Sequence, residues 1–461
     1  MHAFRYISAV VLIFSAIHVS STPAFAQARR VTLDQAVAVA MEQNRDLKVA
    51  QLELEKSGQQ VREAWSNVYP TISGSAQAIH NFRAVQFFPN TIFAAQSPEA
   101  APPPLSFTPF VLENFQLVNA TVSIQQPLFQ GAIYAGVRAA SVVDKLSKES
   151  YVGSRASVQS SVKQSYYLVL TSYERVKVLE QSILRNELAL SDSRKSFRQG
   201  LVADIDTLRA FVAVENLRPQ LIQAKNSADN TLTLLKIRMG IPESEQLMLT
   251  DSLVYDPQTT EPTEPAAYAE ALANRAEVRQ LELNVKLGDE QIAAEFAGHL
   301  PSLIAVGQLQ VLTQTTDLSK SVFPSSLYAG LQLTVPIFQG FKVDSKVQQA
   351  VIAKKQTETQ LDNLKEVVRS EIRVRLSGVV EARQRLEVQR YTVNAAERSF
   401  AITRSRRQQG IGTQLELTDA DRSLTEAKTN YLSAVSDYLT AKVNLDLALG
   451  RLGRDSDLGT K

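Results

Sequence analysis

A hexapeptide motif that occurs in two similar copies constrains the fold of this chain more than any other feature. Residues 126–131 read Gln-Pro-Leu-Phe-Gln-Gly, and residues 335–340 read Val-Pro-Ile-Phe-Gln-Gly. In both places an alternating apolar and polar run precedes the motif and a long Ala/Leu/Val-rich run follows it, so the period changes from that of a strand to that of a helix. Proline cannot donate to a strand ladder, and its fixed φ suits a helix start. Each copy therefore predicts a corner where a strand closes at proline and a helix begins.

The run after each corner predicts a long helical hairpin. Residues 131–198 contain no proline, and a helix of that length would span about 100 Å. Its apolar residues Val162, Tyr166 and Val169 follow a heptad, as in a coiled coil. Glycine then marks a tip at residues 199–204, and a returning helix ends near Gly240. The second copy repeats this pattern, with a long helix over 340–409, a tip at Gly410 and a return over 413–450.

The spacing of distant landmarks indicates an internal duplication. Pro127 and Pro336 stand 209 residues apart, and Gly200 and Gly410 stand 210 apart. Near-equal offsets at two separate landmarks are typical of a tandem repeat. We assign repeat one to residues 31–250 and repeat two to 264–453, with a Pro/Thr/Glu-rich linker over 251–265 between them.

Four strands are predicted, two in each repeat. Alternating runs at 71–78, 118–125, 302–316 and 331–335 place them within residues 70–128 and 301–337. The strand–helix corners fall at Pro70, Pro127, Pro301 and Pro336. Upstream, Thr32 and Gln35 form a capping signal for a helix that runs to about Ser66.

Composition and targeting signals place the chain outside the cytoplasm. The 461 residues are 44% hydrophobic and 21% charged with a net charge of +2, which excludes a disordered or nucleic-acid-coating protein. Residues 1–26 have the pattern of a secretory signal, ending in Ala24-Phe25-Ala26. No later segment approaches about 20 apolar residues, so membrane insertion would have to use β-strands.

Four strands in one chain cannot close a barrel, so chains must pool their strands. Exposed strand edges are not tolerated in lipid. Two chains would give eight strands with a filled interior, whereas three would give twelve and an open bore. The strands carry polar residues on one face, and aromatic residues gather near both ends of the strands, as in membrane barrels: Tyr69, Phe129, Phe338 and Phe341 at one end, Phe87, Phe88, Phe110, Phe323 and Tyr328 near the other. The alternative is an ordinary β-meander with aromatics in its core.

Together, the signal, the paired corners, the echo of Asn44-Arg45 in Asn274-Arg275 and the glycine-centred tips resemble the outer-membrane efflux protein (TolC) family. The resemblance covers nearly all of the mature chain (27–461). It implies a mainly α fold with a small β part, built from duplicated hairpins and four strands per chain. It also implies a homotrimer with a 12-stranded β-barrel in the outer-membrane lipid and a 12-helix α-barrel in the periplasm. Such a protein is a passive exit duct for efflux or type I secretion, driven by an inner-membrane pump through a periplasmic adaptor.

The resemblance further implies roles for residues at the tips. Aligned on the tip glycines, Asp206 matches the family's first-repeat gate acid, and Glu416 and Asp419 match its paired lumen acids. Arg407 stands where an aromatic gate residue is usual, and Gly412 where a basic residue is usual. An Arg407–Asp206 lock is one substitute for the usual gate. The alternative is that Asp204 and Asp206 cap the returning helix.

Five residues of the two tips, Gly200, Leu201, Val202, Gly410 and Ile411, are the candidates for adaptor contact.

Enzymatic chemistry finds no support in the sequence. There is no H-E-x-x-H, G-x-S-x-G, Walker loop or cysteine cluster. We expect no cofactor, no metal and no nucleic-acid partner. The competing hypothesis from another class is a periplasmic coiled-coil scaffold or adhesin stalk without a pore.

Overall fold

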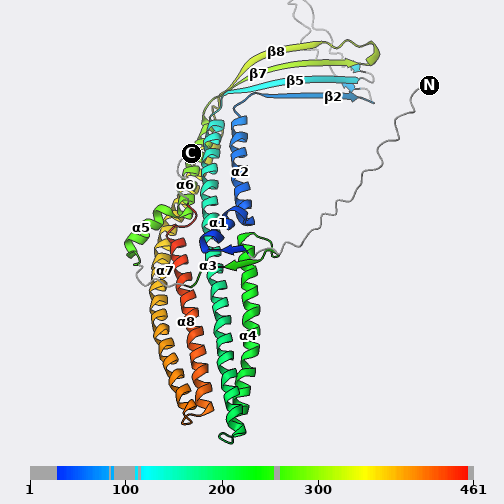
Figure 1. Ribbon diagram of the computed structural model, residues 1–461. Coiled ribbons are helices and arrows are strands. Elements are labelled where there is room, and N and C mark those ends of the chain that lie inside the picture. Colours follow the sequence, from blue (N-terminus) through cyan, green and yellow to red (C-terminus); the bar gives the residue numbers. More distant parts are fainter. Residues whose placement is uncertain (1–28, 83–84, 88–109, 113–115, 254–259, 455–461) are drawn as a thin grey trace, which may run out of the picture. The chain divides into compact units, whose positions relative to one another are not determined.

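The computed structural model describes residues 29–82, 85–87, 110–112, 116–253 and 260–454 (Figure 1). The predicted signal peptide lies outside these residues. The described chain divides into two compact units. Unit 1 contains the described parts of residues 1–45, 158–259 and 379–443, and unit 2 those of 46–157, 260–378 and 444–461.

Two long helical hairpins dominate the chain. Helix α3 (Gly131–Arg198) has 68 residues and is followed by α4 (Asp204–Met239); α7 (Lys342–Gln408) has 67 residues and is followed by α8 (Gln414–Ala448). Within unit 1, Figure 1 shows α4 returning beside α3 and α8 returning beside α7. The predicted duplicated hairpins, with their turns at Gly200 and Gly410, are confirmed.

The heptad predicted for the first long helix lies on its packed face. On α3, Val162, Tyr166 and Val169 are completely buried. The Tyr166 hydroxyl donates to the Val31 carbonyl at 3.0 Å, and it lies 3.0 Å from a carboxylate oxygen of Asp251. Burial, reinforced by Asp251, raises the pKa of Tyr166 above its usual range. On α8, Leu424, Ala427, Ala434 and Tyr438 have heptad spacing and are buried as well.

Unit 2 contains an antiparallel four-stranded sheet. Its strands are β2 (Thr71–His80), β5 (Gln116–Phe129), β7 (Ser302–Thr315) and β8 (Ser325–Thr334), in the order β2-β5-β7-β8. Figure 1 shows the four strands side by side as one ribbon. All four predicted strands are therefore confirmed, although three extend beyond the predicted ends. Within the described residues, the outer edges of β2 and β8 have no strand paired to them.

The strand register separates the sheet into an apolar face and a polar face. Gly74, Val122, Leu309 and Leu327 lie opposite one another across the four strands, and the next row contains Ser73, Ser123, Gln308 and Tyr328. The polar row is bonded across strands, because the Ser73 and Ser123 hydroxyls lie 2.8 Å apart and the Tyr328 hydroxyl donates to Gln308 at 2.8 Å. On the apolar face, Val122, Leu309 and Leu327 are exposed.

The first corner differs from its prediction. Strand β5 does not close at Pro127, which pairs with Ile304, and the strand continues through a register shift to Phe129. A register irregularity accommodates a residue that lacks an N–H, so the proline is tolerated inside the strand. The second corner begins as predicted: β8 ends at Thr334, Pro336 follows, and Gly340 (φ 59°) and Phe341 (φ 60°) turn the chain into α7. Pro70 and Pro301 directly precede β2 and β7.

Unit 1 also contains a small sheet that the sequence pattern did not predict. Strands β1 (Arg29–Val31) and β6 (Leu247–Leu249) pair in parallel. Each has only three residues, which is too short for an alternating pattern to be detected. The predicted linker over 251–265 is also shorter than expected, because α5 (Glu264–Asn274) begins inside it.

The helix predicted to run from Thr32 to Ser66 is two helices. The Thr32–Gln35 capping box is present at the start of α1 (Leu33–Gln43), but the chain breaks at Asn44 (ψ 130°) before α2 (Arg45–Ser66). The Asn44 side chain donates to the Arg238 carbonyl at 2.7 Å. The contact of Asn44 with Arg238 therefore fixes where the helix breaks, and the helical period of the sequence does not predict the break.

The same packing arrangement occurs in both repeats. Gly240 (φ 78°) ends α4 against Gln43 and Asn44, and an added Cβ would lie 2.2 Å from the Gln43 carbonyl oxygen. Gly450 (φ 72°) ends α8 against Asn274 in the same way, and an added Cβ would lie 2.7 Å from its carbonyl carbon. Each glycine lets a long helix end directly on the break between two shorter helices.

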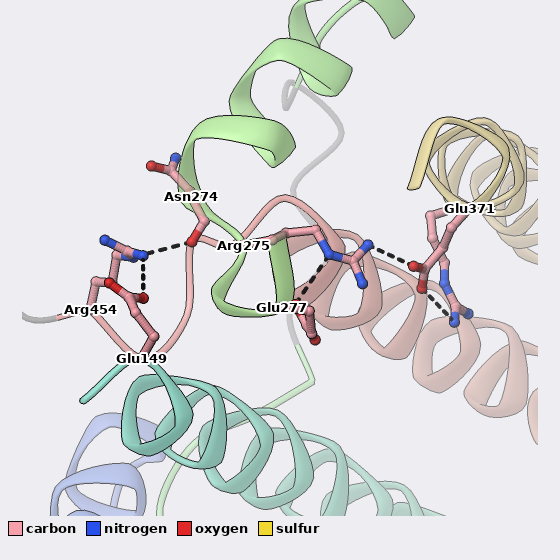
Figure 2. A network of polar contacts seen from close by, with 7 residues as sticks. Glu149, Asn274, Arg275, Glu277, Glu371 and Arg454 are labelled. Atoms are coloured by element: carbon pink, nitrogen blue, oxygen red, sulfur yellow. Dashed lines mark hydrogen bonds and ion pairs between the residues drawn. The ribbon is translucent and has the colours of Figure 1, made fainter. Parts of the chain in front are cut away.

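Figure 2 shows the polar contacts around the second of these breaks. Arg454 donates to the Asn274 carbonyl at 3.1 Å and pairs with Glu149 of α3 at 3.0 Å. Arg275 pairs with Glu371 of α7 at 2.6 Å. These contacts tie the break to α3, to α7 and to the end of the described chain.

The remaining described elements all lie in unit 2. Strands β3 (Val85–Phe87) and β4 (Phe110–Leu112) form a small antiparallel pair, and α6 (Ala276–Phe296) with the 3₁₀ turns Ala297–His299 and Leu318–Lys320 completes unit 2. Among the described residues, no helix is both long enough and apolar enough to cross a membrane.

Candidate functional site

The two hairpin tips have closely similar backbone turns. Gly200 (φ 72°) and Gly410 (φ 77°) both adopt the left-handed conformation that closes a helix. The N–H groups of the residues that follow, Leu201 and Ile411, donate back to the carbonyls of Ser196 and Arg406 at 2.9 and 3.0 Å. No atom lies within 4 Å of an added Cβ at either glycine, so the backbone conformation alone requires glycine there.

Both tips present apolar side chains to solvent. Leu201 is 73% exposed and Ile411 is 65% exposed, while Val202 is half-buried. On α4, Ile205, Leu208 and Val212 continue the apolar surface away from the tip, and with Leu415 they line a groove of about 350 Å³. Large aliphatic side chains exposed on consecutive helical turns are typical of a surface that another protein covers.

The acids at the first tip do not cap α4 with their side chains. The N-cap residue is Ala203, whose side chain makes no capping bond, so the interpretation of Asp204 and Asp206 as caps is wrong in this sense. Both carboxylates instead lie in the first turn, where negative charge favours the helix dipole. The Asp206 carboxylate is 4.0 Å from the guanidinium of Arg209. Within the described part of a single chain, Asp206 and Arg407 form no ion pair.

Glu416 has a local structural role at the second tip. The Thr413 hydroxyl accepts from the Glu416 N–H at 3.2 Å, and the Glu416 carboxylate accepts from the Thr413 N–H at 3.2 Å. This reciprocal pair is a capping box for α8. Glu416 and Asp419 are both exposed, one helical turn apart on α8.

Arg407 lies on a cavity between helices rather than beside Asp206. The cavity has a volume of about 400 Å³ and is lined by the last turns of α3 and α7 and the first turns of α8, all in unit 1. Other basic side chains in its lining are Arg185, Lys195 and Arg404.

Aromatic side chains lie at both ends of the sheet. Tyr69, Phe129, Phe338 and Phe341 are exposed at the end where the strands join helices. Phe323 and Tyr328 are exposed toward the other end. The side chains of Phe87, Phe88 and Phe110, which were assigned to that second group, lie outside those that the structure describes.

No metal site was found among the described residues, in which no three His, Cys, Asp or Glu side chains gather closely enough to hold an ion.

Comparison with known families decides what this arrangement is. The family model described as "Outer membrane efflux protein" matches residues 36–240 and 267–451, one segment within each of the ranges assigned to the two repeats. The chain belongs to the outer membrane efflux protein family. It is an exit channel of the outer membrane, of the kind that serves efflux and type I secretion, and the hypothesis of a scaffold or stalk without a pore does not fit this membership. The family is one of channels rather than enzymes.

Individual members of the efflux protein family agree with this assignment. Outer membrane protein TolC of Vibrio cholerae is 22% identical over 73% of this chain and 77% of its own length. Alkaline protease secretion protein AprF of Pseudomonas aeruginosa is 24% identical over 72% of this chain and 69% of its own length. The crystal structure of the CmeC outer membrane channel of Campylobacter jejuni superimposes with a TM-score of 0.72 at 19% identity, covering 91% of this chain and 85% of CmeC.

One polar cluster of this efflux-family chain was missed in the sequence analysis. Asp421 of α8 is 4% exposed, and its carboxylate accepts from Arg185 at 2.5 Å and from Ser182 and Asn186 at 2.6 Å, all on α3. Its sequence signal is a charged residue in an apolar face, four residues after Leu417 and three before Leu424. A buried carboxylate is tolerated because every bond that it needs is supplied by α3.

Proposed function

We propose that three copies of this chain assemble into one outer-membrane duct. The observation that carries the proposal is the four-stranded sheet with two unpaired edges, β2 and β8, and one exposed apolar face. Unpaired edges and open sheets are unstable in lipid, so β8 of one chain pairs with β2 of the next until the ring closes. Three chains give a 12-stranded barrel with an open bore, whereas two give a barrel that side chains fill.

The orientation of the two faces supports the same assembly. The row that includes Val122, Leu309 and Leu327 faces lipid, and the hydrogen-bonded row that includes Ser73, Ser123 and Gln308 lines a wet lumen. The exposed aromatics at the two ends of the strands mark the two membrane interfaces. The paired hairpins of three chains form a 12-helix periplasmic barrel, whose seams use the heptads of α3 and α8.

We further propose that the tips form the periplasmic entrance and bind an adaptor that links the duct to an inner-membrane pump. The exposed apolar residues Leu201 and Ile411, on the glycine turns at Gly200 and Gly410, support adaptor docking, with Val202 beside them. Asp206, Arg407, Glu416 and Asp419 are the proposed gate and lumen residues. An Arg407–Asp206 lock, absent within one chain, would have to form between neighbouring chains.

The domain boundaries are proposed on the same basis. Residues 1–26 are a signal removed on export, and the mature chain is one duplicated protomer with repeats at 31–250 and 264–453. The equivalent packing of Gly240 on Asn44 and of Gly450 on Asn274 supports this division. We further propose that the inner-membrane pump selects the substrate and the duct does not, because the named relatives include both an outer membrane protein, TolC, and an alkaline protease secretion protein, AprF.

The assembly is tested on the protein extracted from outer membranes in non-ionic detergent. Native mass spectrometry should give three chains, and reconstitution into planar bilayers should give discrete conductance steps. A monomer or a dimer would contradict the twelve-stranded ring. A trimer that conducts no ions, even after Asp206→Ala and Arg407→Ala together, would contradict the duct.

A further inference from the structure

The cavity at the end of α3, α7 and α8 has an excess of positive charge. Its lining contains four cationic side chains, Arg185, Lys195, Arg404 and Arg407, and two anionic ones, Asp192 and Asp421. Both carboxylates already have cationic partners in the lining: Asp421 pairs with Arg185 at 2.5 Å, and Asp192 lies 3.5 Å from Lys195. Arg404 and Arg407 are left, and neither has a carboxylate within ion-pair distance in the described part of the chain.

The two arginines without partners lie one helical turn apart. Residues three apart on a helix are surface neighbours, and like charges so placed repel each other. An anion between Arg404 and Arg407 would remove this repulsion. Guanidinium groups bind carboxylate and phosphate through two parallel hydrogen bonds, so this arrangement suits either oxyanion.

A third guanidinium of the lining, that of Arg185, is held in place by its neighbours. Arg185 of α3 donates through Nε to Asp421 and through one terminal nitrogen to Thr425 at 3.3 Å, and its guanidinium lies 5.4 Å from the ring centre of Phe400. These contacts fix the guanidinium in one orientation, which reduces the entropy cost of binding a ligand.

Apolar side chains form part of the lining beside uncharged polar ones. Leu188, Ala189, Phe400 and Leu417 contribute side chains, so the wall combines cationic and hydrocarbon surfaces. A cavity of about 400 Å³ lies within the usual size range of small-molecule sites. A bare inorganic ion would leave the apolar wall unused, whereas an anion with an aromatic or aliphatic body would contact both parts.

We propose that this cavity binds an amphiphilic organic anion, in which one carboxylate or phosphate group contacts Arg404 and Arg407 and an apolar body lies against Phe400 and Leu188. The proposal goes beyond the duct function, and every lining residue belongs to unit 1 of a single chain. A ligand in this position would contact both hairpins at once.

The test is isothermal titration of the full-length protein in dodecyl maltoside with phenyl phosphate, inorganic phosphate and phenol. We expect phenyl phosphate to bind once per chain at roughly submillimolar concentration, and both other probes to bind about tenfold more weakly or not at all. Arg404→Gln and Arg407→Gln should each weaken phenyl phosphate binding by about tenfold. Both residues lie near the helix surface, so the substitutions should leave folding intact, which the helical circular dichroism signal checks.

Arg406→Gln is the matched control. This substitution removes the same charge from the same last turn of α7, but Arg406 does not line the cavity. The affinity of the variant for phenyl phosphate should therefore stay within about twofold of the wild type. Three results would overturn the proposal: no heat of binding with phenyl phosphate at millimolar concentration, equal loss of affinity in Arg406→Gln and Arg407→Gln, or inorganic phosphate binding as tightly as phenyl phosphate.

Discussion

At the residue scale, the buried carboxylate of Asp421 shows how an ionic contact can join two hairpins. Its three donors lie close together on α3 and are Ser182, Arg185 and Asn186. One side chain of α8 is therefore held by a short segment of α3. Each donor would lose its acceptor if the carboxylate were removed. Removing one partner of such a cluster costs more stability than replacing all partners by well-packed apolar residues, because the remaining polar groups stay buried without hydrogen bonds.

Asp421→Ala is therefore expected to destabilise the protein by about 3 kcal/mol, because Arg185 and Asn186 would be left half-buried or buried without their acceptor. The measurement is chemical denaturation followed by helical circular dichroism. Asp437→Ala is the control: Asp437 also lies on α8 and pairs with an arginine, Arg385 at 2.8 Å, but both partners are about half exposed. It should cost less than about 1 kcal/mol. Equal costs for the two variants would contradict the assigned role of Asp421.

Glu371 gives unit 2 a pH-dependent contribution to stability. Burial alone would raise the pKa of this carboxyl, but the hydrogen bond and charge of Arg275, with Arg375 4 residues along α7, bring the pKa below its ordinary value of 4.5. A lowered folded-state pKa means that the stabilisation is fully present above the unfolded pKa. It is lost as the pH falls through the folded value.

Glu371→Gln should accordingly lower stability by about 1 kcal/mol at neutral pH, and the difference from wild type should shrink as the pH falls below about 4.5. Melting temperatures measured at pH 7 and at pH 3 test this. Glu366→Gln is the matched control on the same helix, where an exposed pair with Arg369 makes little difference at either pH. If Glu371→Gln lowered the melting temperature equally at both pH values, the proposed coupling between protonation of Glu371 and stability would be contradicted.

At the element scale, the same cap begins one helix in each repeat. Thr32 and Gln35 form the capping box of α1, and Thr413 and Glu416 form that of α8. The two boxes differ only in that one uses an amide and the other a carboxylate. Because Gln35 completes the first box, a glutamine at position 416 should complete the second. Glu416→Gln therefore keeps the capping role and removes only the charge of the proposed lumen acid.

Glu416→Gln should change the stability of the protein by less than about 0.5 kcal/mol, because the amide oxygen can still accept from the Thr413 N–H. If three Glu416 carboxylates ring the entrance, the same substitution should markedly weaken block of the bilayer conductance by multivalent cations. Glu426→Gln, an exposed acid farther along α8, should leave the block unchanged. Unaltered block in Glu416→Gln would restrict Glu416 to its capping role.

At the scale of the whole molecule, the isolated sheet is an incomplete structure. Among the described residues, no strand pairs with the outer edge of β2 or of β8, and large apolar side chains on one face of the sheet are exposed. Lipid covers that face in the proposed ring, and neighbouring chains cover the edges. Substitutions at two adjacent residues of β8 test which face of the sheet meets lipid, because successive side chains of a strand point to opposite faces.

Leu331→Arg should impair insertion into the outer membrane, since arginine facing the hydrocarbon costs about 2–4 kcal/mol near its middle. Gln332→Arg places the same charge on the polar face and should insert normally. Both native side chains are exposed in the single chain, at 70% for Leu331, so neither substitution disrupts a packed core. Fractionation of cells between membrane and soluble material gives the readout. Similar insertion of both variants would contradict the assignment of the two faces.

The sequence analysis and the structure agree where a feature is local and long. Apolar periods over dozens of residues predicted both hairpins, alternation predicted four strands and their two faces, and glycine predicted the tips, because backbone geometry at these places follows from residues close in the chain. The capping box at Thr32 was predicted for the same reason. The residues assigned to the tips lie there, whereas Pro127, assigned to a corner, lies inside β5. The roles of the tip residues in gating and docking stay predictions.

The features that only the tertiary structure determines depend on residues far apart in the chain. The break at Asn44 depends on the carbonyl of Arg238, the three-residue strand β1 depends on β6, and the buried position of Asp421 depends on donors more than 200 residues away. The placement of Arg407 on a cavity wall likewise follows from how α3 packs on α7 and α8. A single sequence records periods and caps because these act between near neighbours, but it does not record which distant groups meet, since that choice is made by packing.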